Sequence, residues 1–225
     1  MDRLYFITHT NEKYSYFESA CLALDCGIKL IQLRMKHAEE DLFRKTALQT
    51  LKECEKYGAR LILNDNYRLA KELGADGVHI GQKDEALSIV RSSVCQNQIV
   101  GMTCNTFEQI VSAAKSGADY IGLGPYRFTS TKENLSPVLG IEGYRNIMRQ
   151  CRQAGINIPI YAIGGIRTED VTELIETEVY GIAISSLILQ SSSPQKQIAV
   201  LRKQIAVSAE QNGVSAGQNG VLENG

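Results

Sequence analysis

Eight short apolar runs, separated by stretches with helical spacing, predict an α/β fold, a single-domain (β/α)8 barrel of the TIM type. The runs are almost continuously apolar rather than alternating, which is typical of parallel strands buried on both faces. The chain has 225 residues, of which 44% are hydrophobic, and this is enough for one large core. An open doubly wound sheet is the alternative, but no G-x-G-x-x-G motif follows the first run.

The predicted strands follow one another along the whole barrel region. They cover Leu4–Thr8, Lys29–Leu33, Arg60–Leu63, Gly77–Ile80, Ile99–Met102, Tyr120–Leu123, Pro159–Ile163 and Gly181–Ile184. In a barrel of this type the carboxyl ends of all strands meet at one face, where the chemistry takes place. Polar residues that directly follow these runs are therefore the candidates for a functional site.

Helices are expected between the strands. They cover Tyr16–Cys26, Glu39–Tyr57, Tyr67–Leu73, Ala86–Ser92, Thr106–Ser116, Gly143–Ala154, Thr168–Glu176 and Pro194–Ile205. Several are followed by a glycine, which favours the left-handed conformation that ends a helix: Gly27, Gly58, Gly74, Gly117 and Gly155. Thr168, which precedes two acidic residues, is predicted to be an N-cap.

The last residues of the chain differ in composition from the rest. Residues 208–225 are rich in Gly, Asn, Gln and Ser and have too few apolar side chains to pack. We therefore expect residues 1–207 to form the barrel and residues 208–225 to form a disordered tail.

Charge and cysteine spacing exclude several classes of protein. The net charge of −1 gives no overall basic field for nucleic acid or an anionic membrane. No apolar stretch approaches the roughly 20 residues of a membrane span. The first residues form a strand-like run rather than a positively charged region followed by an apolar one, so we expect no signal sequence there. The cysteines have neither C-x-x-C nor metal-ligand spacing, so we expect small buried hydrophobes in a reducing cytoplasm. They are Cys21, Cys26, Cys54, Cys95, Cys104 and Cys151.

Cationic side chains follow the second predicted strand. Gln32, Arg34 and Lys36 alternate along the chain, so their side chains are expected on one side. Two cations and an amide at a strand end suit the oxygens of a polyanion. An exposed basic strand end is the alternative, which the position of Gln32 inside the apolar run disfavours.

Two aspartates follow neighbouring predicted strands. Asp65 lies directly after the third strand beside Asn64, and Asp84 follows the fourth. Two carboxylates beside bound phosphates are a usual Mg²⁺ arrangement, because phosphate oxygens and waters supply the remaining ligands. The alternatives are structural, since Asn-Asp-Asn is an ordinary turn sequence and Asp84 could cap a helix.

Two further segments are predicted to bind anions. Thr129-Ser130-Thr131-Lys132 follows the sixth strand and offers hydroxyls, backbone N–H groups and an ammonium, although a solvated loop has the same composition. Gly164-Gly165 follows the seventh strand and Ser185-Ser186 the eighth. Barrels of this type commonly hold a phosphate at these two strand ends, whereas a tight turn alone would explain the glycines but not the serines.

General acids and bases are scarce among these strand ends. Thr103 offers a hydroxyl after the fifth strand, and His79, inside the fourth, is predicted to be a hydrogen-bonded core residue rather than a general base. No Ser/His/Asp or Cys/His arrangement is evident. A site rich in anion-binding groups and poor in acid–base groups favours a reaction in which diphosphate leaves, and disfavours hydrolysis or proton abstraction.

Taken together, these motifs resemble the thiamine-phosphate synthase family over roughly residues 3–205. The resemblance is carried by Gln32-x-Arg34-x-Lys36, Asn64-Asp65, Asp76-Gly-Val-His-x-Gly-Gln-x-Asp84, Gly122-x-Gly-Pro-x-x-x-Thr129-x-Thr131-Lys132, Ile163-Gly-Gly-Ile166 and Ser185-Ser186. It implies a transferase that joins 4-amino-2-methyl-5-hydroxymethylpyrimidine diphosphate to a thiazole ethyl phosphate. The implied products are thiamine phosphate and diphosphate, with carbon dioxide when the thiazole carries a carboxylate.

The resemblance also implies a role for each matching residue. The pyrimidine diphosphate would contact Gln32, Arg34, Lys36, Asn64, Thr103 and Lys132, of which Arg34, Lys36 and Lys132 would be catalytic. One Mg²⁺ per subunit would be held by Asp65 and Asp84. The thiazole phosphate would contact Thr129, Ser130, Thr131, Gly165, Ser185 and Ser186. Diphosphate would leave dissociatively with the help of Mg²⁺, and the thiazole nitrogen would then attack.

Two departures from the family pattern are small. Thr103 stands where serine is usual, which keeps the hydroxyl, and Ser185 stands where an apolar residue is common. The alternatives are a thiazole tautomerase-like enzyme and a non-catalytic barrel that binds thiamine precursors. We expect small-molecule substrates, no nucleic-acid or membrane partner and a cytoplasmic location, and the sequence leaves a homo-oligomer open.

Overall fold

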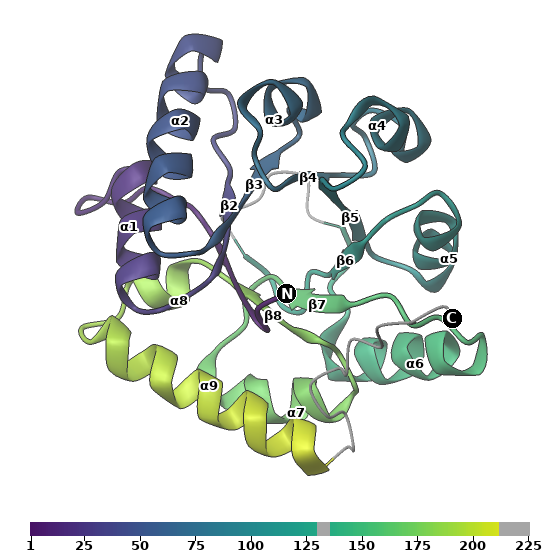
Figure 1. Ribbon diagram of the computed structural model, residues 1–225. Helices are drawn as coiled ribbons and strands as arrows, with labels where there is room; N and C mark the ends of the chain where they lie inside the picture. Colours follow the sequence, from purple (N-terminus) through teal and green to yellow (C-terminus); the bar gives the residue numbers. More distant parts are fainter. Residues whose placement is uncertain (130–135, 212–225) are drawn as a thin grey trace, which may run out of the picture.

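The computed structural model describes residues 1–129 and 136–211, and within them the chain forms a closed barrel of eight parallel strands surrounded by helices (Figure 1). The strands follow one another around the barrel in sequence order, from β1 to β8. The predicted fold class is therefore confirmed. None of the helices in these ranges is long and apolar enough to cross a membrane.

Every predicted strand is present, with ends that differ by at most two residues. The strands are β1 (Leu4–Ile7), β2 (Leu30–Leu33), β3 (Arg60–Asn64), β4 (Gly77–Ile80), β5 (Ile99–Cys104), β6 (Tyr120–Leu123), β7 (Ile160–Ile163) and β8 (Gly181–Ile184). The longer β3 and β5 include Asn64 and Thr103, which we had expected just beyond the strand ends. β1 also pairs with β8, with Leu4 beside Ile182, and this pairing closes the barrel.

The predicted helices are also present, and one short helix is additional. They are α1 (Tyr16–Asp25), α2 (Glu40–Lys56), α3 (Tyr67–Leu73), α4 (Leu87–Ser93), α5 (Phe107–Lys115), α6 (Gly140–Gln153), α7 (Val171–Glu176), α8 (Ser186–Leu189) and α9 (Pro194–Gln211). The short α8 was not predicted, because four residues are too few to show helical periodicity. The five glycines expected after helices all have positive φ, between 58° and 90°.

Three sequence predictions need correction. Thr168 is not an N-cap: it begins a 3₁₀ turn, Thr168–Asp170, and its side chain makes no capping bond there. The tail boundary at residue 208 is too early, because α9 continues to Gln211 and Ser208 is buried. Of the cysteines expected to be buried, Cys95 is exposed in the connection after α4, and Cys21 and Cys26 are half-buried. The rest of the predicted disordered tail, residues 212–225, lies outside the described ranges.

The hydrophobic core has two layers. The larger layer lies between the strands and the surrounding helices, and a smaller one fills the barrel. The inner layer is built from Tyr5, Leu30, Ile62, Tyr120, Tyr161 and Ala183. Its three tyrosine rings meet edge to face, with centroids 5.5–5.7 Å apart. Gly101 leaves the room for one of them, since a Cβ there would lie 2.0 Å from Cζ of Tyr120.

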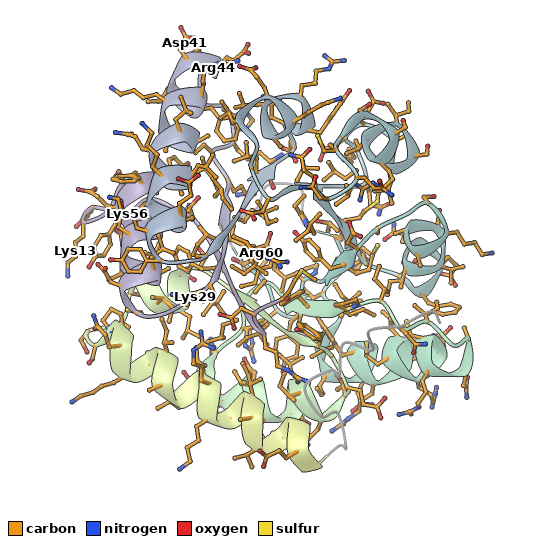
Figure 2. All side chains as sticks on the ribbon, viewed as in Figure 1. Lys13, Lys29, Asp41, Arg44, Lys56 and Arg60 are labelled. Atoms are coloured by element: carbon orange, nitrogen blue, oxygen red, sulfur yellow. The ribbon has the colours of Figure 1, made fainter. Side chains whose placement is uncertain are left out.

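Charged side chains lie mainly on the outside of this arrangement. Figure 2 shows Lys13, Asp41 and Lys56 pointing away from the barrel, and all three are exposed. The apolar layers are therefore enclosed by a polar surface, as expected for a single core.

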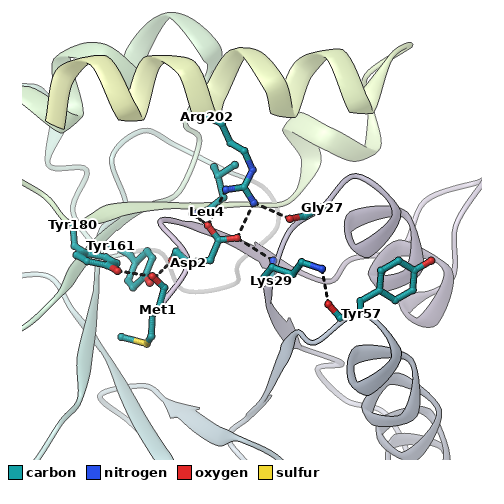
Figure 3. A network of polar contacts seen from close by, with 9 residues as sticks. All are labelled: Met1, Asp2, Leu4, Gly27, Lys29, Tyr57, Tyr161, Tyr180 and Arg202. Atoms are coloured by element: carbon teal, nitrogen blue, oxygen red, sulfur yellow. Dashed lines mark hydrogen bonds and ion pairs between the residues drawn. The ribbon is translucent and has the colours of Figure 1, made fainter. Parts of the chain in front are cut away.

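A polar cluster ties together the amino-terminal end of the barrel (Figure 3). The Asp2 carboxylate accepts hydrogen bonds from the backbone N–H groups of Leu4 (3.1 Å) and Lys29 (3.0 Å) and from the Arg202 guanidinium (3.1 and 2.8 Å). Arg202 also donates to the carbonyl oxygen of Gly27 at 2.8 Å. The cluster therefore joins β1, the start of β2 and α9, on the face opposite to the strand carboxyl ends.

We predict that Arg202→Ala lowers the free energy of unfolding by about 1–3 kcal/mol, because it leaves the Asp2 carboxylate, only 9% exposed, without its cation. Urea unfolding measures this loss.

Arg152→Ala is the matched control, since Arg152 pairs with Glu178 on the surface and its side chain is 60% exposed. Its loss should stay below about 0.5 kcal/mol. Equal losses in the two variants would show that the cluster does not contribute specially to barrel closure.

Candidate active site

The predicted site residues that the structure describes all lie at or beyond the carboxyl ends of strands. Gln32, Asn64 and Thr103 lie within the last residues of β2, β3 and β5. The others that are described follow β2, β3, β4, β6, β7 and β8: Arg34, Lys36, Asp65, Asp84, Thr129, Gly165, Ser185 and Ser186. Ser130, Thr131 and Lys132 fall outside the described residues, so their roles stay predictions.

The residues that follow one another along β2 reach different depths. Gln32 is 2% exposed, and its Nε2 donates to the hydroxyl of Tyr5 at 2.6 Å. The backbone N–H of Arg34 donates to Oγ1 of Thr8 at 2.9 Å, which fixes the chain as it leaves the strand. Lys36 is exposed, and its ammonium contacts the Asp65 carboxylate. The series from Gln32 to Lys36 therefore extends from the barrel interior to its rim.

Asp65 is held in an unusual backbone conformation. Its φ is +64°, in the left-handed region where Asp and Asn are the most tolerated residues after glycine. Its N–H donates to the carbonyl oxygen of His79 at 2.8 Å, and its own carbonyl accepts from the N–H of Tyr67 at 2.9 Å. Asn66, the next residue, caps α3 by accepting from the N–H of Leu69. The turn around Asp65 is therefore fixed by its neighbours.

Asp84 lies close to Asp65. One carboxylate oxygen of Asp84 accepts from the N–H of Gly81 at 2.6 Å, and α4 begins only at Leu87, so Asp84 does not cap that helix. The pKa of Asp65 lies above its ordinary value, chiefly because burial disfavours the charge. The Lys36 ammonium, which contacts Asp65, lowers this pKa, and the nearby Asp84 carboxyl raises it.

This pair of carboxylates fits a divalent cation that takes its other ligands from phosphate and water. Across residues 1–129 and 136–211, no group of three or more His, Cys, Asp or Glu side chains comes together as a complete cage. Mg²⁺ is usually bound in this way, by one or two carboxylates together with substrate phosphates. The donor set is thus suitable for Mg²⁺ with a phosphate ligand.

A cavity of about 420 Å³ opens beside these residues, between α2 and α3. Lys36, Asn64 and Asp65 line one side, and Arg44 and Arg68 line the other. Two of the predicted diphosphate residues, Lys36 and Asn64, and the predicted metal ligand Asp65 therefore border open space. The cavity lies beside the barrel rather than over its centre.

The chain that leaves β6 packs directly on the glycine turn after β7. The N–H groups of Tyr126 and Arg127 donate to the carbonyl oxygens of Ile163 (2.8 Å) and Gly164 (2.9 Å). At Gly165, where φ is +66°, an added Cβ would lie 2.8 Å from the carbonyl oxygen of Phe128. The close packing of residues 125–128, which we call the β6 exit, therefore requires glycine at position 165. Thr129 follows this segment directly.

An ion pair that the sequence did not reveal fixes this junction. Arg127 forms a two-pronged contact with Asp170 (2.6 and 2.9 Å) and also donates to the carbonyl oxygen of Gly165 at 2.8 Å. Burial raises the pKa of Asp170, whereas the Arg127 guanidinium and the N–H of Arg167 lower it. The lowering effects together are larger, so the pKa of Asp170 lies below its ordinary value. Sequence alone gave no signal for this pairing, because neither residue belongs to a recognisable motif.

Asn105 was also missed as a candidate for positioning the site, although its amide directly follows β5. Its Nδ2 donates to the carbonyl oxygens of Gly124 (2.9 Å) and Pro137 (3.0 Å). These two residues lie on either side of the segment that includes Thr129. Asn105 therefore holds the two ends of that segment together.

Ser185 carries a polar atom that the fold leaves unsatisfied. Its hydroxyl oxygen is buried and has no hydrogen-bond partner among the described residues. Ser185 precedes α8, yet its side chain does not cap that helix. Buried polar atoms usually have a partner, so an orphaned hydroxyl at the carboxyl end of β8 indicates a place for a ligand oxygen.

The position of His79 matches its prediction. It is 5% exposed, with Nδ1 2.9 Å from the Tyr120 hydroxyl and Nε2 2.9 Å from Oγ1 of Thr103. It is a hydrogen-bonded core residue beneath the site.

Comparison with known proteins agrees with these observations. The family model described as thiamine monophosphate synthase matches residues 4–188. The thiamine-phosphate synthase of Bacteroides fragilis is 50% identical over 194 residues, which are 86% of this chain and 95% of the relative. That of Flavobacterium psychrophilum is 45% identical over 179 residues, covering 80% of this chain and 87% of the relative.

A solved structure is similar as well. The thiamine phosphate pyrophosphorylase from Pyrococcus furiosus superposes with a TM-score of 0.79 at 30% identity, covering 92% of this chain and 96% of that one. The family match extends over the strands that carry the paired carboxylates, the glycine turn and the orphaned serine. The chain therefore belongs to the thiamine monophosphate synthase family of transferases, which confirms the resemblance carried by its sequence motifs.

Proposed function

We propose that this chain condenses 4-amino-2-methyl-5-hydroxymethylpyrimidine diphosphate with 4-methyl-5-(2-phosphoethyl)thiazole to give thiamine phosphate and diphosphate. When the thiazole is the 2-carboxy form, its carboxylate is also released as carbon dioxide. The observation that carries this proposal is the placement of Lys36, Asp65 and Asp84 just after β2, β3 and β4, with the Lys36 ammonium in contact with the Asp65 carboxylate. Family membership supplies the substrates, and these three groups supply a place for a departing diphosphate.

The pyrimidine diphosphate occupies the side of the barrel formed by β2 to β5. Its proposed contacts are Gln32, Arg34, Lys36, Asn64, Thr103 and Lys132. Five of these six residues are described, and all five come from β2, β3 and β5 or the residues just after β2. Arg34 and Lys36 bring positive charge to the rim, which suits a ligand with two phosphoryl groups.

One Mg²⁺ per subunit is proposed at Asp65 and Asp84. When bound, the ion would neutralise charge on the diphosphate oxygens and so make diphosphate a better leaving group. The left-handed conformation of Asp65 and the Gly81 N–H bond of Asp84 hold these carboxylates in place. Lys36, which contacts Asp65, is close enough to contribute positive charge to the same leaving group.

The thiazole phosphate occupies the opposite side, at the exits of β6, β7 and β8. Its proposed contacts are Thr129, Ser130, Thr131, Gly165, Ser185 and Ser186. The orphaned hydroxyl of Ser185 supports this placement, because a phosphate oxygen would satisfy it. The packing of the β6 exit on Gly165 supports it too, since it brings Thr129 to the same end of the barrel.

The chemistry then needs no side-chain nucleophile. The bond between the pyrimidine methylene carbon and the diphosphate oxygen breaks, and the electron pair leaves with the diphosphate. Arg34, Lys36 and Lys132 stabilise the negative charge that develops there, while the electron-rich aminopyrimidine carries the positive charge. The thiazole nitrogen then forms the new bond to the methylene carbon. Contacts to the phosphate groups of both substrates keep these two atoms aligned.

A thiazole tautomerase-like enzyme and a non-catalytic barrel that binds thiamine precursors are the alternatives. No diphosphate leaves in either of them, so neither requires the Asp65 and Asp84 pair. We also place the protein in the cytoplasm, a proposal that its free cysteines support. A homo-oligomer stays a prediction.

Incubating the purified chain with both substrates and Mg²⁺, with and without a chelator, tests the proposed function. We expect thiamine phosphate by chromatography, and much less of it when the chelator removes the metal. Absence of product under every condition would reject the transferase proposal.

We predict that Asp65→Asn lowers turnover by about 100-fold or more, because the variant keeps a residue type that tolerates positive φ but loses a charged metal ligand. Turnover as a function of Mg²⁺ concentration measures the effect, and circular dichroism checks the fold. Asp41→Asn, an exposed carboxylate on α2, is the control and should behave as wild type. Unchanged turnover in Asp65→Asn would refute the metal assignment.

We predict that Ser185→Ala raises the KM for the thiazole phosphate by about tenfold without lowering the free energy of unfolding, since its hydroxyl has no partner among the described residues to lose. Ser19→Ala is the kinetic control, because the Ser19 hydroxyl already donates to the carbonyl oxygen of Tyr16 at 2.7 Å. A clear loss of stability in Ser185→Ala, or an unchanged KM, would contradict the phosphate role.

A further inference from the structure

Five polar side chains form a continuous hydrogen-bonded chain across the inside of the barrel. Nε2 of Gln32 lies 2.6 Å from the hydroxyl of Tyr5, and this hydroxyl lies 2.7 Å from that of Tyr120. The Tyr120 hydroxyl lies 2.9 Å from Nδ1 of His79, and Nε2 of His79 lies 2.9 Å from Oγ1 of Thr103. We call this series the interior chain.

The interior chain links two residues on different sides of the proposed pyrimidine site. Gln32 comes from β2 and Thr103 from β5, while β1, β6 and β4 supply Tyr5, Tyr120 and His79 between them. The four residues from Gln32 to His79 are at most 5% exposed. Because water has little access, each buried group depends on its partner in the chain, and a hydrogen bond made the wrong way round would leave an unsatisfied group.

The direction of these hydrogen bonds follows from the Gln32 end. The amide nitrogen of Gln32 can only donate, so Tyr5 accepts there. Among the hydrogen bonds of the described residues, the Tyr120 hydroxyl is the acceptor available to the buried Tyr5 hydrogen, so we take Tyr5 to donate to Tyr120. Tyr120 in turn donates to Nδ1 of His79, which must be unprotonated. The remaining proton of a neutral His79 is then on Nε2 and is donated to Thr103. The Thr103 hydroxyl keeps its own hydrogen for another acceptor.

We propose that Tyr5, Tyr120 and His79 are positioning residues that set which group accepts and which donates where the pyrimidine ring binds. The chain presents the amide oxygen of Gln32 as an acceptor and the hydroxyl of Thr103 as a donor. The identity of the ligand rests on the proposed function, whereas the direction of the chain does not.

Both tyrosines keep the hydrogens that this direction requires. Burial raises the pKa of Tyr5 and that of Tyr120, so neither phenol ionises near neutral pH. A phenolate at either position could only accept hydrogen bonds from its two neighbours, so the hydrogen bonds would no longer all run in the same direction. Each phenol therefore passes on a single hydrogen.

An aminopyrimidine carries the complementary groups. Its exocyclic amine donates hydrogen bonds and its ring nitrogens accept them, so it can use one acceptor and one donor of fixed direction. A 4-oxo analogue has an acceptor in place of the amine, so its oxygen would face another acceptor, the amide oxygen of Gln32. The interior chain thus gives specificity for the amino form without the two tyrosines touching the substrate, since a mismatched polar group in a buried site is costly.

The protonation of His79 in the free protein tests the direction of the chain. In ¹⁵N-labelled protein, NMR of the imidazole nitrogens should show a protonated Nε2 and an unprotonated Nδ1 for His79. The sequence has three histidines, and His79→Asn identifies the signals by their loss. A proton on Nδ1, or on both nitrogens, would overturn the proposal. This measurement needs no substrate, so it tests the direction of the hydrogen bonds in the interior chain even if the proposed function is wrong.

Tyr120→Phe interrupts the chain at its centre and tests its effect on binding. We expect the KM for the pyrimidine diphosphate to rise roughly tenfold, the KM for the thiazole phosphate to stay unchanged, and discrimination against the 4-oxo analogue to fall. The His79 signals should also move toward a mixture of the two neutral forms. Unchanged discrimination and an unchanged His79 form would overturn the proposal.

Tyr161→Phe is the matched control. Its ring packs against Tyr5 and Tyr120 at 5.5 and 5.7 Å, but its hydroxyl donates to the carbonyl oxygen of Asp2 and lies outside the chain. It should leave both KM values and the His79 form as in wild type. If Tyr120→Phe does not fold, Tyr5→Phe interrupts the same chain one bond earlier and carries the same expectations.

Discussion

The closed parallel register of the eight strands is the constraint on which the rest of the structure depends. Pairing of β1 with β8 completes the barrel, and parallel order makes every strand end at the same face. Residues as distant in sequence as Asp65 and Ser185 therefore lie on one rim, and each occupies its place because its strand is in register with its neighbours. The alternation of side chains within each strand then decides which residues face the barrel interior and which face the helices.

The two ends of the barrel differ in how well their polar groups are satisfied. At the amino-terminal end, the Asp2 carboxylate has donors on both oxygens, and Arg202 joins α9 to the strands. At the carboxyl-terminal end, Asp65 adopts a left-handed conformation, and the Ser185 hydroxyl has no partner within residues 1–129 and 136–211. Such departures from the locally most stable arrangement are typical of sites that bind ligands, and here the fold around them supplies the stability.

The barrel interior has two physical roles. Its tyrosine rings fill space as apolar side chains do, and Gly101 makes room for one of them. The hydroxyls of Tyr5 and Tyr120 at the same time join Gln32 to Thr103 through His79, so the same residues contribute to packing and to hydrogen bonding. On the outer side, Arg127, Asp170 and Asn105 hold the β6 exit against the glycine turn. The proposed substrate contacts thus depend on residues that touch no substrate.

The sequence by itself determined the fold class and the order of strands and helices, and it placed the candidate site residues at the strand ends. It could do so because apolar periodicity and strand-end motifs are local signals that survive without knowledge of the tertiary contacts. The short α8, the 3₁₀ turn at Thr168 and the helical start of the predicted tail were missed or misplaced, since these depend on packing. The Arg127 and Asp170 pair, the orphaned Ser185 hydroxyl and the interior chain were decided only by the tertiary structure. Each joins or isolates atoms from segments far apart in the chain, and only barrel closure determines which of those segments meet.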